Sequence, residues 1–340
     1  MLDNALRAFA ERHAPHHQEI VQVAGDASFR RYYRLVDNPS RIVMDAPPDK
    51  EDSHPFVAIA GFLREHGVLA PQVLQADYEQ GLFLLEDFGD ITFARALQQG
   101  VAPERLYGAA VDALLTLQAT PLEGGTVAHQ RAFDPPLFAY EASLLTEWYI
   151  PGVMGYTLSG AEQAEFKRAF DELLRPILAQ PQVLVHRDYH SRNLMWLEGQ
   201  VGVLDFQDAV MGPITYDLAS LLRDCYVAWD RPFRHAMMQQ WLSGATQRLG
   251  YAPTWASFER AFDWMAIQRN LKAVGIFGRL ALRDGKFAYL DDVPRTMGYV
   301  WETLARYPEL GRLHTLLQRT IPPGTEPSSA QVAARQTGAL

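Results

Sequence analysis

The spacing of hydrophobic residues changes twice within the first 90 residues, from the spacing typical of strands to that typical of a helix and back. This order predicts a sheet whose strands are interrupted by a single helix. Residues 53–66 carry apolar side chains at helical spacing and end at Gly67. Five segments rich in Val, Ile, Leu, Tyr and Phe predict strands on either side of that helix: 19–24, 29–36, 41–44, 72–76 and 82–86. The order β-β-β-α-β-β therefore predicts a small five-stranded sheet.

The chain from Thr92 to about Leu317 reads differently, as a series of amphipathic helices. The exception is residues 183–206, where three short apolar runs predict a small β island with a tight hairpin at Glu198-Gly199-Gln200. We expect an α+β protein with two lobes. The predicted parts are an N-terminal lobe (1–88), a hinge (86–90), a mostly helical C-terminal lobe (91–320) and a flexible tail (321–340) whose small and polar residues cannot repay the entropy of ordering.

The charge balance narrows the class of partner. The 340 residues hold 40 acidic and 31 basic side chains, a formal net charge of −9. Nucleic acids and anionic membranes attract clustered cations, so we expect a small-molecule ligand, with neither nucleic acid nor membrane as a partner and no obligate protein partner. The sequence contains no long apolar segment and only one cysteine, Cys225. Both features favour a cytoplasmic location.

The β island carries the strongest chemical signal, His186-Arg187-Asp188-Tyr189-His190-Ser191-Arg192-Asn193, followed by Asp205 at the end of a predicted strand. Phosphoryl transfer needs a carboxylate that orients and deprotonates the acceptor hydroxyl, and hard oxygen ligands for Mg²⁺. Asp188, Asn193 and Asp205 supply both kinds of group. A lone His-x-Asp is more often a polar turn, but the full pattern between strands favours a catalytic loop.

With Leu204-Asp205-Phe206-Gln207-Asp208 and the run Gly212 to Leu222, this motif resembles the aminoglycoside phosphotransferase and choline kinase family over roughly residues 20–290. The resemblance implies a bilobal protein-kinase-like fold and ATP-dependent phosphorylation of a hydroxyl. By position, it implies that Asp188 is the catalytic base and that Asn193 and Asp205 are Mg²⁺ ligands. It also implies that His186 packs the loop and that Asp217 supports it; Arg187 stands where the family commonly has glycine.

The nucleotide side departs from the usual kinase pattern. A kinase pairs a Lys on its third strand with a Glu of the next helix, whereas this chain has Met44 or Asp45 there and only Lys50 among its first 166 residues. Arg30, Arg31, Arg34 or Lys50 could contact the phosphates instead, and an arginine fork binds them at least as well as an ammonium. The loop between the first two strands is either a plain hairpin turn or a phosphate loop, and the hinge backbone is expected to bind adenine; the ATP-binding candidates are Ser28, Phe29, Arg30, Arg31, Glu86 and Phe88.

The acceptor candidates mix acidic, basic and aromatic side chains, so a neutral or anionic sugar fits better than a polycation. They are Glu141, Arg187, Gln207, Asp208, Arg223, Trp229 and Arg269. For each of them a structural role in the core or on a solvated face is the alternative. Two functional alternatives also remain open: a kinase for an aminoglycoside or choline-type acceptor, and a nucleotide-binding pseudokinase, suggested by the missing strand lysine.

Overall fold

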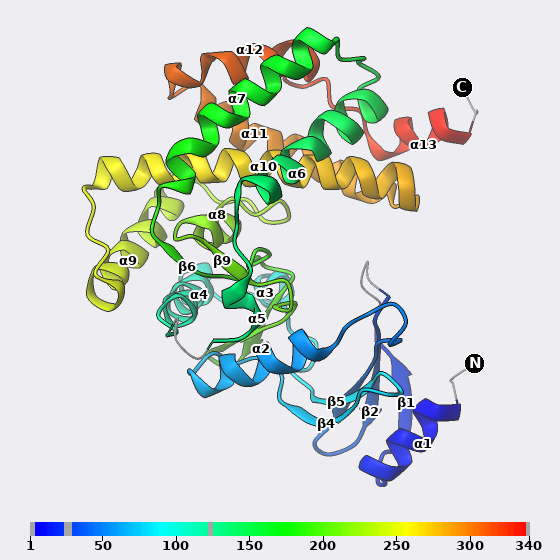
Figure 1. The fold of residues 1–340 in the computed structure, drawn as a ribbon. Helices are drawn as coiled ribbons and strands as arrows, with labels where there is room; N and C mark the ends of the chain where they lie inside the picture. Colours follow the sequence, from blue (N-terminus) through cyan, green and yellow to red (C-terminus); the bar gives the residue numbers. More distant parts are fainter. Residues whose placement is uncertain (1–3, 24–28, 122–124, 338–340) are drawn as a thin grey trace. The chain divides into compact units, whose positions relative to one another are not determined.

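A computed structural model describes residues 4–23, 29–121 and 125–337, and the chain divides into two compact units (Figure 1). The first unit comprises residues 1–131 and 192–210, and the second comprises 132–191 and 211–340. The chain therefore passes from the second unit back to the first between Ser191 and Arg192, inside the predicted catalytic loop.

The first unit contains the predicted five-stranded sheet, and all of its pairings are antiparallel. In spatial order the strands are β1 (Glu19–Gln22), β2 (Arg31–Val36), β3 (Arg41–Asp45), β5 (Leu82–Glu86) and β4 (Val73–Asp77). The helix α2 (His54–Glu65) joins β3 to β4. The predicted order β-β-β-α-β-β is confirmed, because each strand alternates its side chains between two faces while α2 keeps the 3.6-residue period.

The helix α1 (Asn4–His13) covers one face of this sheet. Its Leu6 and Phe9 form a buried cluster with residues that include Val43 and Leu84. Three further helices of the first unit are α3 (Phe93–Gln98), α4 (Pro103–Gln118) and α5 (Val127–Gln130).

The hairpin predicted in the β island joins β7 (Leu194–Leu197) to β8 (Gln200–Val203). Its two turn residues, Glu198 and Gly199, both have positive φ, 52° and 114°. A two-residue turn of this kind matches the right-handed twist of the paired strands. Pairing brings the two ends of the hairpin together, so the N–H of Leu204 donates to the carbonyl of Asn193 at 2.9 Å.

The second unit is built around α10 (Trp255–Asp284), a helix of 30 residues. It packs against α6 (Pro135–Leu144), the π-helix η1 (Leu145–Val153), α8 (Tyr216–Leu222) and α11 (Val293–Leu304). Gly275 of α10 allows the closest approach, because a Cβ there would lie 2.6 Å from the backbone of Leu144. None of the helices that the structure describes is long and apolar enough to cross a membrane.

The remaining elements of the second unit surround this core. They are α7 (Gly160–Leu178), β6 (Gln182–Val185), β9 (Val210–Pro213), α9 (Arg231–Leu249), η2 (Phe287–Asp292), η3 (Pro308–Leu310), α12 (Gly311–Thr320) and α13 (Ser329–Thr337). β6 pairs with β9, and Val210 at the start of β9 belongs to the first unit.

The division of the chain differs from the predicted boundary near residue 88. The first unit extends to residue 131 and recruits the hairpin β7–β8, because α3 packs against β7 and α4 against β8. These contacts join segments about a hundred residues apart in sequence, which local composition does not reveal.

The expected flexible tail also differs from the structure, since α13 packs on η2. Val332 is 1% exposed, the backbone and side chain of Ser329 both donate to Asp291, and Arg335 donates to the carbonyl of Val153 at 3.2 Å. One buried valine and a few polar contacts therefore order a segment whose composition suggested disorder.

Candidate active site

The predicted catalytic loop begins where β6 ends, and Asp217 of α8 holds its first residues. The Asp217 carboxylate accepts the backbone N–H of His186 at 2.7 Å and that of Arg187 at 3.0 Å. Burial raises the pKa of Asp217 to about 6, although His186 and the two N–H donors favour its charged form. His186 is fully buried, and its Nδ1 accepts the N–H of Asp188 at 3.2 Å. These bonds define the path of the chain up to Asp188.

Asp188 is partly exposed and lies among cationic side chains. Burial acts to raise its pKa, but Lys272 outweighs this effect together with His190, Arg269 and Arg187, so the pKa lies well below its ordinary value. The carboxylate is therefore ionised at neutral pH, the state in which it can accept a hydrogen bond from an acceptor hydroxyl.

A buried polar group beside Asp188 centres on Glu141 of α6. Oε1 of Glu141 accepts from Arg187 Nη2 at 2.9 Å and lies 3.3 Å from Lys272 Nζ, and its Oε2 accepts from Gln268 Nε2 at 2.9 Å. Lys272 also donates to the hydroxyl of Tyr216 at 3.1 Å. We call Glu141, Arg187, Tyr216, Gln268 and Lys272 the Glu141 cluster.

Sequence reasoning selected Glu141 and Arg187. It placed Gln268 and Lys272 with Arg269 on one helix near the acceptor, with a solvated face as the alternative for Arg269 and Lys272, but did not include Gln268, Lys272 or Tyr216 among the selected site residues. The available signal was Lys272 itself, one of four lysines in the chain, placed one helical turn after Gln268. Arg269, next to Gln268 on α10, is 5% exposed, and its charge acts on Asp188 and Asp217.

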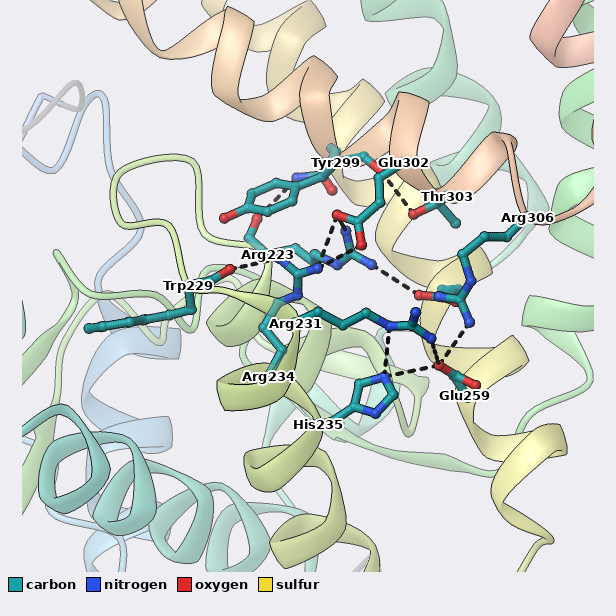
Figure 2. A network of polar contacts seen from close by, with 12 residues as sticks. Arg223, Trp229, Arg231, Arg234, His235, Glu259, Tyr299, Glu302, Thr303 and Arg306 are labelled. Carbon is teal, nitrogen blue, oxygen red and sulfur yellow. Dashed lines mark hydrogen bonds and ion pairs between the residues drawn. The ribbon is translucent and has the colours of Figure 1, made fainter.

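Two other acceptor candidates, Arg223 and Trp229, lie in a different polar network of the second unit (Figure 2). Arg223 donates to Asp263 at 3.1 Å and to Glu302 at 3.4 Å, and its guanidinium stands 5.1 Å from the ring centre of Tyr299. The carbonyl of Trp229 accepts from Arg234 at 2.7 Å in the same network. These contacts connect α8, α9, α10 and α11, so both residues have a structural role in holding these helices together.

In the first unit, the hairpin brings the two predicted metal ligands together. Asn193 Nδ2 lies 3.3 Å from Asp205 Oδ2, and Gln207 Nε2 donates to Asp205 Oδ1 at 2.6 Å. Gln207 is thus a partner of Asp205, while the neighbouring Asp208 is exposed. Asp205 has a φ of 63°, a left-handed conformation rare for a residue with a Cβ.

This donor set fits Mg²⁺. Among the residues that the structure describes, no group of three or more His, Cys, Asp or Glu side chains is arranged to hold a metal. Mg²⁺ in phosphoryl-transfer sites needs less, because it keeps several waters and takes one or two carboxylates together with substrate phosphates. One carboxylate, with the side-chain amide of Asn193 beside it at the same end of a hairpin, matches that requirement.

The arginines near the first two strands are already paired with carboxylates. The side chain of Arg30 lies 3.3 Å from that of Glu51. The side chain of Arg31 on β2 lies 2.6 Å from that of Asp45, its cross-strand partner on β3. Phe29 is 62% exposed, whereas Met44, where a kinase lysine was sought, is fully buried. Ser28 lies outside the described residues.

Lys50 and the hinge are also engaged within the first unit. Lys50 Nζ lies 5.2 Å from the ring centre of Phe29. At the hinge, Glu86 accepts from Arg64 at 2.7 Å. Phe88 packs on Gly202 of β8, where a Cβ would come within 2.6 Å of its ring.

Fold and site together define a phosphotransferase, and the chain belongs to the phosphotransferase enzyme family, which it matches over residues 19–256. It is 43% identical over 310 residues to the N-acetylmuramate/N-acetylglucosamine kinase of Pseudomonas aeruginosa, covering 91% of this chain and 90% of that protein. It is 39% identical over 309 residues to the protein of the same name from Neisseria meningitidis, covering 89% and 91%.

Solved structures agree on the fold. The ADP-bound aminoglycoside phosphotransferase APH(2'')-Ib superposes with a TM-score of 0.62 at 14% identity, covering 89% of this chain and 99% of that one. A choline/ethanolamine kinase family protein from Mesorhizobium loti gives a TM-score of 0.60 at 15% identity, covering 92% and 98%. The expected protein-kinase-like fold is confirmed.

Proposed function

We propose that this protein transfers the γ-phosphoryl group of ATP to the anomeric hydroxyl of N-acetylmuramate and N-acetylglucosamine, giving the α-1-phosphates in the recycling of peptidoglycan sugars. The similarity to kinases named for these two sugars, over about nine-tenths of both chains, supports the choice of acceptor. The single observation that carries the chemistry is the placement of Asp188 on a loop whose backbone Asp217 holds, where the nearby Lys272 lowers the pKa of the Asp188 carboxyl.

In the proposed reaction, Asp188 accepts a hydrogen bond from the anomeric hydroxyl and orients its oxygen in line with the γ-phosphorus. As the new P–O bond forms and the bond to the leaving ADP oxygen breaks, the hydroxyl proton passes to Asp188. An anomeric hydroxyl is more acidic than an ordinary alcohol, so a carboxylate of low pKa is an adequate base. Asn193 and Asp205 would hold Mg²⁺, which neutralises phosphate charge when bound.

For the nucleotide, we propose that arginine replaces the missing strand lysine. Arg31 of β2 is the best candidate, because its side chain is half exposed. Its ion pair with Asp45 also holds the guanidinium beside β3, the strand that carries the lysine in other kinases. Ser28, Phe29 and Arg30 belong to the same proposed phosphate contact, and the backbone from Glu86 to Phe88 to the proposed adenine contact. A guanidinium binds phosphate oxygens at least as well as an ammonium does.

The test is turnover of purified protein with ATP and Mg²⁺ on four acceptors: N-acetylmuramate, N-acetylglucosamine, an aminoglycoside and choline. Phosphorus NMR of the products should show a sugar 1-phosphate for the first two only. Phosphorylation of the aminoglycoside or choline instead would establish the alternative kinase. ATP binding without turnover on any acceptor would favour a pseudokinase.

A further inference from the structure

Arg187 adopts a backbone conformation that a side chain disfavours. Its φ is 79°, in the left-handed region where glycine is the residue of least strain. Strain of this kind persists where the surroundings hold the residue in place, and here Asp217 accepts the N–H of Arg187 at 3.0 Å. The arginine side chain therefore extends from a fixed backbone position next to Asp188.

The guanidinium of Arg187 is fixed in orientation but retains a donor. Nη2 donates to Glu141 at 2.9 Å, and the group stands 6.0 Å from the ring centre of Phe133. Nε is buried and has no hydrogen-bond partner among the described residues. With 19% of its side chain exposed, against 1% for Glu141 and 7% for Lys272, Arg187 is the most accessible of these three charged groups.

The charge and the polar atoms of the Glu141 cluster favour an acidic ligand. Arg187 and Lys272 share one carboxylate, Glu141, so the cluster carries a net charge of +1. Asp188 is the nearby anion, and the proposed reaction commits it to the acceptor hydroxyl. The amide oxygen of Gln268 is buried and likewise lacks a partner among the described residues, so it could accept from a hydroxyl or amide N–H.

We infer that Arg187 binds the carboxylate of an acidic acceptor sugar and thereby favours N-acetylmuramate over N-acetylglucosamine. This inference rests on the proposed function. The two sugars share the ring, the N-acetyl group and the anomeric hydroxyl, and N-acetylmuramate adds a lactyl ether that ends in a carboxylate. A guanidinium already oriented by Glu141 offers N–H donors to that carboxylate at little further cost in ordering.

The test compares kcat/KM for the two sugars in wild-type protein and in Arg187→Gln. The ratio of N-acetylmuramate to N-acetylglucosamine should fall by about tenfold or more, which corresponds to about 1.4 kcal/mol. Arg283→Gln, an exposed arginine on the same helix as Lys272, is the matched control and should keep the wild-type ratio. Arg187→Gly, free of backbone strain, should reproduce the loss if Arg187→Gln folds poorly.

A second measurement needs no variant. The wild-type protein should use the methyl ester of N-acetylmuramate about tenfold less well than the free acid, because the ester cannot form the charge-assisted bond. Equal use of acid and ester, or an unchanged ratio in folded Arg187 variants, overturns the inference. If the KM for ATP of the Arg187 variants rose equally with both sugars, Arg187 would be a nucleotide contact, and the inference would also be overturned. Wild-type protein inactive on both sugars would instead refute the proposed function.

Discussion

At the scale of single residues, Lys272 determines the properties of the proposed base. Its ammonium contacts Glu141 and Tyr216, and it is the largest favourable charge acting on the Asp188 carboxylate. Burial would otherwise raise the pKa of Asp188. A buried lysine is normally destabilised by the loss of water, but Glu141 keeps the pKa of Lys272 above its ordinary value, so the charge persists.

We predict that Lys272→Met raises the pKa of Asp188. Only the ionised carboxylate can act as the base, and its wild-type pKa lies well below the ordinary value, so wild-type kcat/KM should not fall on account of Asp188 down to pH 4. Without the Lys272 charge, burial raises the pKa of Asp188, so the variant should lose activity as the pH falls toward 4. The measurement is kcat/KM between pH 4 and 9. Lys167→Met, which removes an exposed lysine paired with Asp171, should leave the profile in place. A Lys272 variant whose kcat/KM is as independent of pH near pH 4 as that of wild-type protein would contradict this role.

At the scale of elements, local pattern predicted the sheet and the hairpin but not the contacts between distant segments. Glu198-Gly199 encodes its own turn. Asp188 and Asn193 lie in one short motif, and the hairpin returns the chain to Asp205, which lies 12 positions after Asn193. By contrast, the bond between Gln268 and Glu141 joins residues 127 positions apart. Arg223 and Trp229 were selected for their chemistry, yet the network of Figure 2 engages both.

The C-terminal helix α13 shows the same limit and provides a test. Val332→Asp would place a charge where a valine is now buried, so α13 should detach from η2. The free energy of unfolding should fall by roughly 2–4 kcal/mol at most. Hydrogen exchange should show faster exchange over residues 329–337. An exposed position two residues earlier in α13 supplies the control, since Ala330→Asp should change neither measurement. Equal protection of α13 in both variants would contradict its docking through Val332.

At the scale of the whole molecule, the residues with proposed catalytic and metal-binding roles are distributed over the two compact units. Asp188 belongs to the second unit and Asn193 and Asp205 to the first, and the loop that carries Asp188 continues through Arg192 to Asn193. The net charge of −9 gives the chain no general attraction for nucleotide phosphates. Local groups must therefore provide it, and the proposed ones are Mg²⁺ held by Asn193 and Asp205, together with arginines in place of the strand lysine.

The most direct test of this account is sugar-dependent release of ADP by wild-type protein and by Asp188→Asn and Asp205→Ala. Wild-type protein should consume ATP only when Mg²⁺ and N-acetylmuramate or N-acetylglucosamine are present. Each variant should lose turnover by about a thousandfold or more while its circular dichroism and melting transition stay close to wild type. Near-normal kcat in either folded variant would contradict the account.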